Sequence, residues 1–452
     1  MINSIYSTIT TVRGISSKGF LTYLEQLWKQ RGDAFVLPIG GQGMLFAIHP
    51  DYVKHVNVDA SSHYDKGASY NVPRRYLFGN GLITSTGALW RTQRKLMAPF
   101  FTPTNILAYT NMIETEGKRQ IERWEELART EQTIDMTDEM MGLLARIVLR
   151  TMFSIDNPEE NDRIRDAIDY LIANLSFRTR SPFRLPDSFP TSANRRYKSS
   201  REAVQGYIIG LINRRREQAE TNWPDDILTR LMQARDSDTG QRMSDAQLLD
   251  ECITIYAAGS ETTARTLGFA WYILARHPDI AEQLHLETDK VISGEPLTHD
   301  AMKKLTYTMQ ITRETLRLYP AAPLYLRDCI DGDEIAGIKI TQGRPVYMSP
   351  FLTHRHPEFW PEPERFNPDR WTPEAEKARH PYAFHAFAAG ARICIGNNLS
   401  LMEGQILLAM LARHFAPRLN PSDHVITVDQ HGTLYAKNGI PMQIVKRASA
   451  PN

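Results

Sequence analysis

The stretch FAAGARICIGNN, residues 387–398, places a single cysteine, Cys394, in a glycine-containing loop directly before a segment of helical periodicity. Only two other cysteines occur in the chain, Cys252 and Cys329. A cysteine before a helix meets free backbone N–H groups and the positive end of the helix dipole, and both favour the thiolate. A thiolate is a nucleophile or a metal ligand, and Arg392 could bind an anion nearby.

The composition of the 452 residues is that of an ordinary globular protein, with 42% hydrophobic and 23% charged residues. A net charge of +1 gives no general attraction to nucleic acid or to anionic membranes. Three separated cysteines without a CxxC motif argue against a disulfide framework and a structural zinc site. They favour a reducing compartment, so we expect the protein in the cytoplasm. We expect no signal peptide and no membrane anchor, because no stretch reaches the ~18 apolar residues of a membrane span.

Helical periodicity dominates the chain. Residues 136–153 predict a helix that opens with the capping residues Thr137 and Asp138. Residues 244–278 predict the longest helix, which Ser244 or Asp245 can cap. Its middle is apolar on most faces, which predicts a buried helix.

Short strands are predicted near residues 34–48, 322–350 and 424–446, and the first of these regions reads as a hairpin around a glycine-rich turn. Four prolines between Pro357 and Arg370 exclude regular structure there. We therefore predict one continuous domain over residues 1–452, mainly α, with small β-sheets packed at one side.

The cysteine loop carries a known pattern. Phe387, Gly390, Arg392, Cys394 and Gly396 resemble, position for position, the haem-binding signature F-x-x-G-x-R-x-C-x-G of the cytochrome P-450 superfamily. The resemblance implies the cytochrome P-450 fold, haem b as cofactor and Cys394 as its iron ligand. It also implies that the two glycines make room for the flat macrocycle and that Arg392 meets its carboxylate. The alternative, an inert buried cysteine, requires none of these neighbours.

A second motif is the pair Glu314 and Arg317 in RETLRLYP, which share one helix face and can form an ion pair. Taken alone, an exposed helix pair is the simpler interpretation. In the family such a helix pairs with an arginine of a later loop, and Arg365 in PERF matches that position. The implied role is a structural ion-pair network that holds the loop of Cys394.

A third motif, AAGSETT at residues 257–263, lies in the middle of the long predicted helix. Gly259 lowers helix propensity, and the Thr262 hydroxyl can bond a carbonyl one turn back. Both features would also be explained by a local irregularity of the long helix that has no function. The resemblance instead implies a groove where dioxygen sits, with Glu261 and Thr262 as the acid–alcohol pair that delivers protons.

Trp90 and Arg94 stand at i, i+4 in ALWRTQRK, and both side chains suit carboxylates. By resemblance they hold a haem propionate. Arg327 matches the position of a further propionate-binding arginine, although a surface arginine on a strand would also explain it.

The resemblance implies an oxidoreductase: a monooxygenase that uses dioxygen and two externally supplied electrons to hydroxylate or epoxidise an apolar organic substrate. The substrate class is a fatty acid, a terpenoid or a polyketide. We expect no fused electron-transfer domain, so a ferredoxin or flavodoxin with its reductase is the expected partner, and Arg91 and Lys95 could steer it. In its expected lack of a membrane anchor, the protein resembles bacterial members of the family. The residues expected to line the substrate pocket are 69–87, Tyr256, Ala257, 322–325 and 432–437.

Three alternatives stay open at this point. A peroxide-using enzyme or an isomerase or dehydratase of the same haem-thiolate class usually lacks the acid–alcohol pair. A non-enzymatic haem-binding sensor would explain Cys394, Trp90 and Arg94 but not the GSETT motif. A cysteine nucleophile enzyme would need a paired histidine, and His385 is the nearest in sequence.

Overall fold

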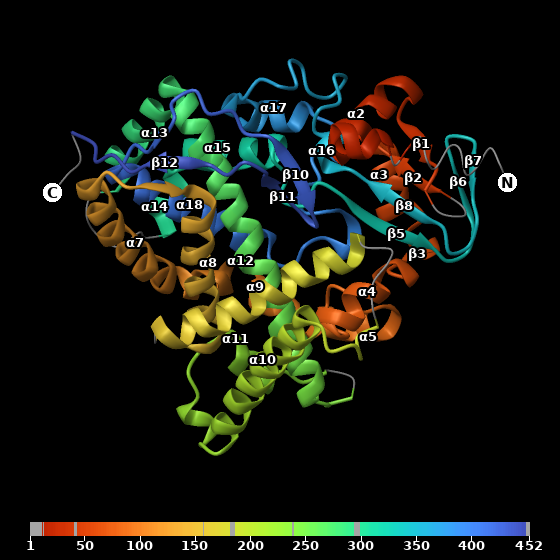
Figure 1. Cartoon of the computed structure of the whole chain (residues 1–452), viewed down its shortest axis with the longest axis horizontal. Helices are drawn as coiled ribbons and strands as arrows, with labels where there is room; N and C mark the ends of the chain where they lie inside the picture. Colours follow the sequence, from red (N-terminus) through yellow and green to blue (C-terminus); the bar gives the residue numbers. More distant parts are fainter. Residues whose placement is uncertain are drawn as a thin grey trace. The chain divides into compact units, whose positions relative to one another are not determined.

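The computed structural model describes residues 11, 13–39, 43–156, 158–180, 186–236, 239–292 and 299–448 (Figure 1). The centre of the predicted glycine-rich turn, residues 40–42, lies outside the described residues. The chain divides into two compact units, of which the first comprises Met1–Ser69, Arg119–Met140 and Thr262–Asn452 and the second Tyr70–Lys118 and Met141–Glu261. The single continuous domain predicted above stays a prediction.

Helices make up most of both units, as the periodicity predicted. Those of the first unit are α2 (Phe20–Arg31), α3 (Pro50–Lys54), α13 (Pro278–Val291), α14 (His299–Lys304), α15 (Thr306–Leu318), α16 (Pro350–Thr353), α17 (Pro373–Ala378) and α18 (Asn397–His414). Those of the second unit are α4 (Asn71–Pro73), α5 (Gly87–Met97), α6 (Pro103–Ile106), α9 (Pro158–Arg180), α10 (Ser192–Arg216) and α11 (Ile227–Gln233). Three helices contribute residues to both units: α7 (Thr110–Thr130), α8 (Met136–Phe153) and α12 (Asp245–Arg276).

Short 3₁₀ and π segments connect the helices. The π segments are η1 (His55–Asp59) and η4 (Arg74–Phe78). The 3₁₀ turns are η2 (Ser61–His63), η3 (Ala68–Tyr70), η5 (Ala98–Phe101), η6 (Leu107–Tyr109), η7 (Glu220–Asn222), η8 (Pro368–Trp371) and η9 (Gly390–Arg392).

All strands of the described residues belong to the first unit. The five-stranded sheet has the order β1 (Ala34–Leu37), β2 (Met44–Ala47), β8 (Pro345–Met348), β5 (Tyr325–Cys329) and β3 (Tyr64–Asp65). The hairpin β1–β2 is antiparallel as predicted, whereas β2 pairs with β8 in parallel (Figure 1). The smaller sheets are β6 (Asp333–Ile335) with β7 (Ile338–Ile340), β10 (Val428–His431) with β11 (Thr433–Ala436), and β4 (Thr133–Asp135) with β12 (Pro441–Gln443) and β9 (Arg418–Leu419). The mainly α fold with small sheets is confirmed.

The face of the five-stranded sheet forms one hydrophobic core with α3 and η1. Its fully buried members include Leu45, Val346 and Met348 from the strands and Val53 and Val56 from the helical segments. Each such side chain contributes about 1.5–3 kcal/mol through burial. Ala389, five residues before Cys394, belongs to the same core. The sheet therefore anchors the loop that carries the cysteine.

The structure shows which residue caps the N-terminus of each of two predicted helices, α12 and α8. At α12 the Ser244 hydroxyl accepts the N–H of Gln247 at 3.3 Å, so Ser244 is the cap. At α8 the prediction was wrong: Asp135 precedes the helix, and its carboxylate accepts the N–H of Thr137 at 2.8 Å. A side chain caps a helix only from a non-helical position, and Thr137 already lies inside the first turn.

Helices α12 and α18 share a buried polar contact. The hydroxyls of Thr263 and Ser400 hydrogen bond at 3.0 Å, and Glu403 lies buried beside Thr263. Burial raises the pKa of Glu403 to about 8, although a hydrogen bond with Thr263 opposes the shift. A carboxyl group in this environment stays protonated at neutral pH.

The most buried ion pair of the first unit joins Glu314 and Arg317 on α15, and both side chains are completely inaccessible to solvent. Arg317 Nε and Nη2 each donate to Glu314 at 2.9 Å. Its remaining donors reach the carbonyl oxygens of His354 at 2.9 Å, Pro363 at 2.7 Å and Arg365 at 3.1 Å. The guanidinium group thus holds the end of α16 and two points of the proline-rich loop.

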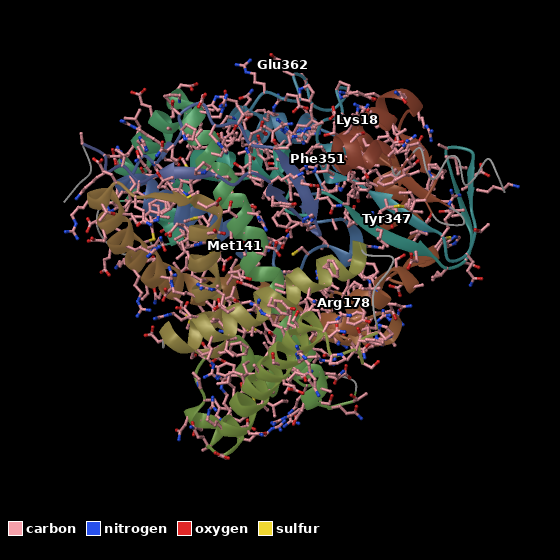
Figure 2. The ribbon with its side chains drawn as sticks, viewed as in Figure 1. Lys18, Met141, Arg178, Tyr347, Phe351 and Glu362 are labelled. Carbon is pink, nitrogen blue, oxygen red and sulfur yellow. The ribbon has the colours of Figure 1, made fainter. Side chains whose placement is uncertain are left out.

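The expected partner of Glu314 was the wrong arginine. Arg370 Nε lies 3.3 Å from Glu314 Oε1, while the Arg365 side chain is exposed and pairs with Glu362 at 3.2 Å. Figure 2 shows Glu362 at the outer edge of the molecule. Asn367 N–H and Trp371 Nε1–H also donate to Glu314, at 2.9 and 3.0 Å. The loop turns at η8, and this turn brings Arg370 rather than Arg365 to the buried carboxylate.

The two arginines provide a test of this network. Arg370→Met removes a cation from a buried carboxylate, and we expect it to lower the free energy of unfolding by roughly 2–3 kcal/mol. Arg365→Met removes only an exposed pair and should cost less than about 1 kcal/mol. Urea denaturation of both variants measures the difference. Equal losses would show that Arg370 has no special role.

Glu403 predicts a pH dependence of stability. Its pKa in the folded protein is raised to about 8 from an ordinary value of 4.5, so the folded state holds the proton more tightly than the unfolded state. Its contribution to the free energy of unfolding must therefore fall as pH rises from 4.5 towards 8. Glu403→Gln should remove this component, while Glu374→Gln on exposed α17 should not. Denaturant titrations at several pH values measure the free energy of unfolding. If this free energy changes with pH in the same way in the wild-type protein and in Glu403→Gln, the expectation is wrong.

Candidate active site

Cys394 lies at the surface of the first unit, at the end of an ordered loop. Its backbone N–H donates to the carbonyl oxygen of Phe387 at 2.9 Å, and Ile393 N–H donates to Gly390 O at 3.0 Å. Gly396 then forms the N-cap of α18. The predicted position of the cysteine, in a loop immediately before a helix, is confirmed. The loop thus places Cys394, an exposed residue, directly before the first turn of α18.

Gly390 serves a different purpose from the one expected. Its φ is +67°, and a Cβ at this position would overlap the carbonyl oxygen of Asn57 on η1. The glycine therefore makes room for another backbone segment of the protein. At Gly396, in contrast, a Cβ would meet no atom within 4 Å, so the space beside that glycine is open.

Three cations gather around the Cys394 loop. Arg392 forms an ion pair with Asp65 on β3, and Lys66 follows directly in the chain. Arg327 on β5 is buried, and its Nη1 donates to the carbonyl oxygen of Leu326 at 2.8 Å. The alternative of a surface arginine at position 327 is therefore wrong.

The electrostatics of Lys66 show how closely these groups approach one another. Burial, followed by repulsion from Arg327 and Arg392, holds the pKa of Lys66 well below its ordinary value, while Asp65 and Cys394 act in the opposite direction. Sequence reasoning missed Lys66. Nothing in YDKGAS distinguishes this lysine from a solvated one, because β3 and β5 become neighbours only in the folded sheet.

This donor set suits a group that combines carboxylates with a soft metal. Cationic side chains near one another are stabilised by bound carboxylates, and a thiolate is a strong ligand for iron. The acid Asp328 beside Arg327 is already engaged, because it accepts hydrogen bonds from Ser69 N–H at 3.0 Å and Ser69 Oγ at 2.6 Å. The residues around Cys394 therefore fit an iron porphyrin with its propionates.

Glu261 and Thr262 lie next to each other on α12, which runs without interruption through Gly259. Both side chains are half-buried. Bonds of the kind predicted for Thr262 occur at two residues near it: Ser260 Oγ donates to Tyr256 O at 2.8 Å, and Thr266 Oγ1 donates to Thr262 O at 3.0 Å.

A further acid accompanies Glu261 in the second unit. Burial raises the pKa of Asp169 on α9 to about 6, and the charge of Glu261 adds to the shift, while Arg165 opposes it. A nearby negative charge disfavours the ionised form of a carboxyl group, so Asp169 holds its proton more tightly than an isolated aspartate does. Sequence periodicity could not identify this neighbour, because it lies on a different helix.

Trp90 and Arg94 occupy consecutive turns of α5 in the second unit, and each is half-buried. Arg91 and Lys95, expected to attract a partner, are exposed on the same helix. The structure thus groups Arg327 and Arg392 with Cys394 in the first unit and assigns Trp90, Arg94 and Glu261 to the second.

Two of the expected pocket segments are held in place by hydrogen bonds. In the second unit, Asp250 accepts Asn80 N–H at 2.7 Å and Glu251 accepts Leu82 N–H at 3.0 Å, which ties residues 79–85 to α12. In the first unit, Leu434 N–H donates to Ala321 O at 2.9 Å and brings residues 432–437 beside 322–325. Tyr256 and Ala257 are both buried.

His385 is unsuited to activate a cysteine nucleophile. Its ring is buried against His354 and Tyr325, at centroid distances of 5.3 and 5.6 Å. Burial lowers the pKa of His385 to about 3, so its imidazole does not take up a proton at neutral pH.

Among the described residues, no group of three or more histidine, cysteine, aspartate or glutamate side chains could hold a metal ion. No described helix is both long and apolar enough to cross a membrane.

Comparison with known proteins identifies the family. A family model described as cytochrome P-450 matches residues 7–443. The chain is 32% identical over 423 residues to cyclooctat-9-en-7-ol 5-monooxygenase of Streptomyces melanosporofaciens, covering 91% of this chain and 90% of that protein. It is also 32% identical over 418 residues to pentalenene oxygenase of Streptomyces avermitilis, covering 92% and 91%.

Comparison with solved structures identifies the same family. The crystal structure of the cytochrome P-450DA heme domain matches with a TM-score of 0.85 and 25% identity, covering 94% of this chain and 92% of that chain. This family binds haem b through a thiolate-ligated iron, and its members include the two monooxygenases above. The chain therefore belongs to the cytochrome P-450 family of haem-thiolate monooxygenases.

Proposed function

We propose that the protein hydroxylates or epoxidises an apolar, terpenoid-like substrate, with dioxygen and two electrons from a separate ferredoxin or flavodoxin and its reductase. The names of the two Streptomyces relatives, pentalenene oxygenase and cyclooctat-9-en-7-ol 5-monooxygenase, support the substrate class. We place the protein in the cytoplasm, because none of its three cysteines, Cys252, Cys329 and Cys394, forms a disulfide bond.

The observation that carries this proposal is the cluster around Cys394. Cys394 would ligate the haem iron, because it is an exposed residue at the end of a loop that is fixed by hydrogen bonds between its own backbone groups. Phe387, Gly390 and Gly396 shape that loop, and Lys66, Arg327 and Arg392 supply positive charge beside it. When bound through this thiolate, haem supplies the activation of dioxygen.

The cationic residues hold the propionates. Arg392 and Arg327 offer planar forks that suit carboxylates, and Lys66 offers an ammonium group that propionates would stabilise. Burial and then repulsion from Arg327 and Arg392 lower the pKa of Lys66, and a bound carboxylate would favour its charged form. Trp90 and Arg94 on α5 provide a further indole N–H and guanidinium group for the same purpose.

Glu261 and Thr262 deliver protons on the side where the substrate is oxidised. The carboxyl group of Glu261 exchanges protons with solvent, and the Thr262 hydroxyl donates and accepts at the reacting centre. Asp169 supports Glu261, because its own pKa near 6 lets it hold a proton close to neutral pH.

Cys394→Ser tests the assignment of the ligand. We expect the reduced wild-type protein with carbon monoxide to show the red-shifted Soret band of thiolate-ligated iron, and the variant to lose that shift. Cys329→Ala, at a buried cysteine on β5, is the matched control and should retain it. An unshifted band in the wild-type protein would overturn the function, and a colourless protein would favour a cysteine nucleophile.

Thr262→Ala tests the proton pathway. Without the hydroxyl, we expect severalfold more hydrogen peroxide and less product for each pair of electrons consumed. Thr262→Ser keeps the hydroxyl and should restore coupling. The measurement compares electron-donor consumption, peroxide and product with a substrate found by spin-state titration. Unchanged coupling in Thr262→Ala would remove Thr262 from the mechanism, and turnover with peroxide alone would favour the peroxide-using alternative.

A further inference from the structure

Two buried histidines lie between the ion-pair network and the loop of Cys394 in the first unit. His354 directly follows α16 and is completely buried, and only 2% of His385 is exposed. Their ring centroids lie 5.3 Å apart, with the rings at 77° to each other. Buried polar side chains in a native structure require an explanation, and the reaction described above uses neither histidine.

The two hydrogen bonds of the His354 ring determine where its proton lies. Its Nε2 lies 3.0 Å from the backbone nitrogen of His385, whose N–H can only donate, so Nε2 accepts. Its Nδ1 lies 3.1 Å from the carbonyl oxygen of Arg317, which can only accept, so Nδ1 carries the proton. Only the neutral ring with its proton on Nδ1 satisfies both partners. A second proton would have to bind Nε2, where the N–H of His385 already points.

The surroundings of His354 oppose a second proton. Burial, followed by the neighbouring His385, holds the pKa of His354 well below the ordinary value of 6.5. The bond to the Arg317 carbonyl acts in the opposite direction, and the charges of Arg317 and Arg355 lower the pKa further. The carboxylates that pair with these two arginines are those of Glu314 and Glu364. His354 is therefore neutral at neutral pH as long as the loop stays closed.

His385 adds a second neutral imidazole at the same place. Its ring packs edge-on against Tyr325 of β5, with ring centroids 5.6 Å apart. Within the part of the chain that the structure describes, neither ring nitrogen of His385 has a hydrogen-bond partner. Burial lowers the pKa of His385 to about 3. Both imidazoles therefore bind fewer protons in the closed loop than they would in contact with water.

The turn after His385 is strained. The N–H of Ala388 donates to the carbonyl oxygen of His385 at 2.9 Å, and the φ of Ala388 is +61°. A residue with a Cβ adopts this left-handed conformation only at a cost in free energy, so the turn persists only while its surroundings fix it. The chain then passes through Gly390 to Cys394. Loss of the hydrogen bond at His385 would free the start of this strained segment.

We propose that His354 is a positioning residue for Cys394, whose neutral imidazole holds the backbone of His385 and thereby the start of the cysteine loop. A proton on Nε2 would replace the hydrogen bond between His354 and His385 by repulsion between two N–H groups. The loop is then held firmly at neutral pH and opens more often as the pH falls. The consequence for iron rests on the proposed function, because it requires Cys394 as the ligand. The opening of the loop itself does not.

The direction of the pH dependence follows from the two protonation states. An imidazole exposed by opening binds a proton with the ordinary pKa of 6.5, whereas the closed loop keeps it neutral. The equilibrium constant for opening must therefore rise as the pH falls below 6.5, by roughly tenfold between pH 6 and pH 5 for each histidine exposed. Most carboxylates are still ionised in this range.

Hydrogen exchange of the full-length, haem-loaded protein measures this opening. We expect the protection factor of peptides that span residues 384–394 to fall by about a hundredfold between pH 6 and pH 5, because both histidines take up protons. His354→Gln replaces Nε2 by an amide oxygen that does not titrate, and the fall should shrink to about tenfold. A protection factor independent of pH, or an unchanged fall in His354→Gln, would overturn the proposal.

A second variant covers the case that His354→Gln does not fold. His385→Leu removes a ring whose nitrogens have no partner among the described residues, and it keeps the backbone N–H that His354 holds. We expect His385→Leu to fold and to retain a fall of about tenfold, which then belongs to His354. Complete loss of the pH dependence in His385→Leu would assign the effect to the wrong histidine and contradict the proposal.

His285→Gln is the matched control. Burial, with a smaller effect of Arg447, lowers the pKa of His285 on α13 to about 4, so this histidine also resists protonation. Its charged neighbours are Arg447 and Asp289, neither of which lies in the cysteine loop. The loop should therefore keep its wild-type pH dependence in His285→Gln. An equal reduction in His285→Gln and His354→Gln would show a general loosening in acid and exclude a special role of His354.

The spectrum of the reduced protein with carbon monoxide separates this inference from the proposed function. We expect the red-shifted Soret band to be lost at a lower pH in His354→Gln than in the wild-type protein, because the loop of the variant opens less readily in acid. Loss at the same pH in both proteins would mean that His354 does not hold the iron ligand. A wild-type protein without the red-shifted band at any pH would overturn the proposed function, and hydrogen exchange would still decide whether His354 holds the loop.

Discussion

The structure of the first unit depends on the ion pair between Glu314 and Arg317, which is completely buried. Burial of two charges is costly unless every donor and acceptor is satisfied. Arg317 has five N–H donors, and all five find acceptors: two bonds reach Glu314, one reaches the carbonyl oxygen of His354 at the end of α16, and two reach those of Pro363 and Arg365 in the proline-rich loop. The loop has to follow this path, because any other would leave a charged donor without a partner.

The same network extends to the cysteine loop. His354 accepts the backbone N–H of His385 through Nε2 at 3.0 Å, and its Nδ1 lies 3.1 Å from the carbonyl oxygen of Arg317. From His385 the chain continues to Gly390, where contact with Asn57 joins it to η1 and the five-stranded sheet. Cys394 is thereby held from two sides, by the ion-pair network and by the sheet. Such support is required of a metal ligand, whose sulfur must keep one position.

Much of the fold and part of the site could be predicted from local patterns. Helices α8 and α12 and the β1–β2 hairpin follow from periodicity, because the repeat of apolar residues reports directly on the buried face. Arg365 and Arg370 show the limit of this reasoning. Both lie in one proline-rich loop with the same chemistry, and only the turn at η8 decides which of them reaches Glu314.

By itself the sequence determined the helical class, the family and the position of Cys394 before a helix, because these depend on residues close together in the chain. Only the tertiary structure decided which charged residues lie close enough to affect one another. Lys66 approaches Arg327 and Arg392 because β3 pairs with β5, and Glu261 on α12 raises the pKa of Asp169 on α9 in addition to the larger effect of burial. Charge interactions act through space across distant parts of the chain, so their partners become evident only once the elements are packed.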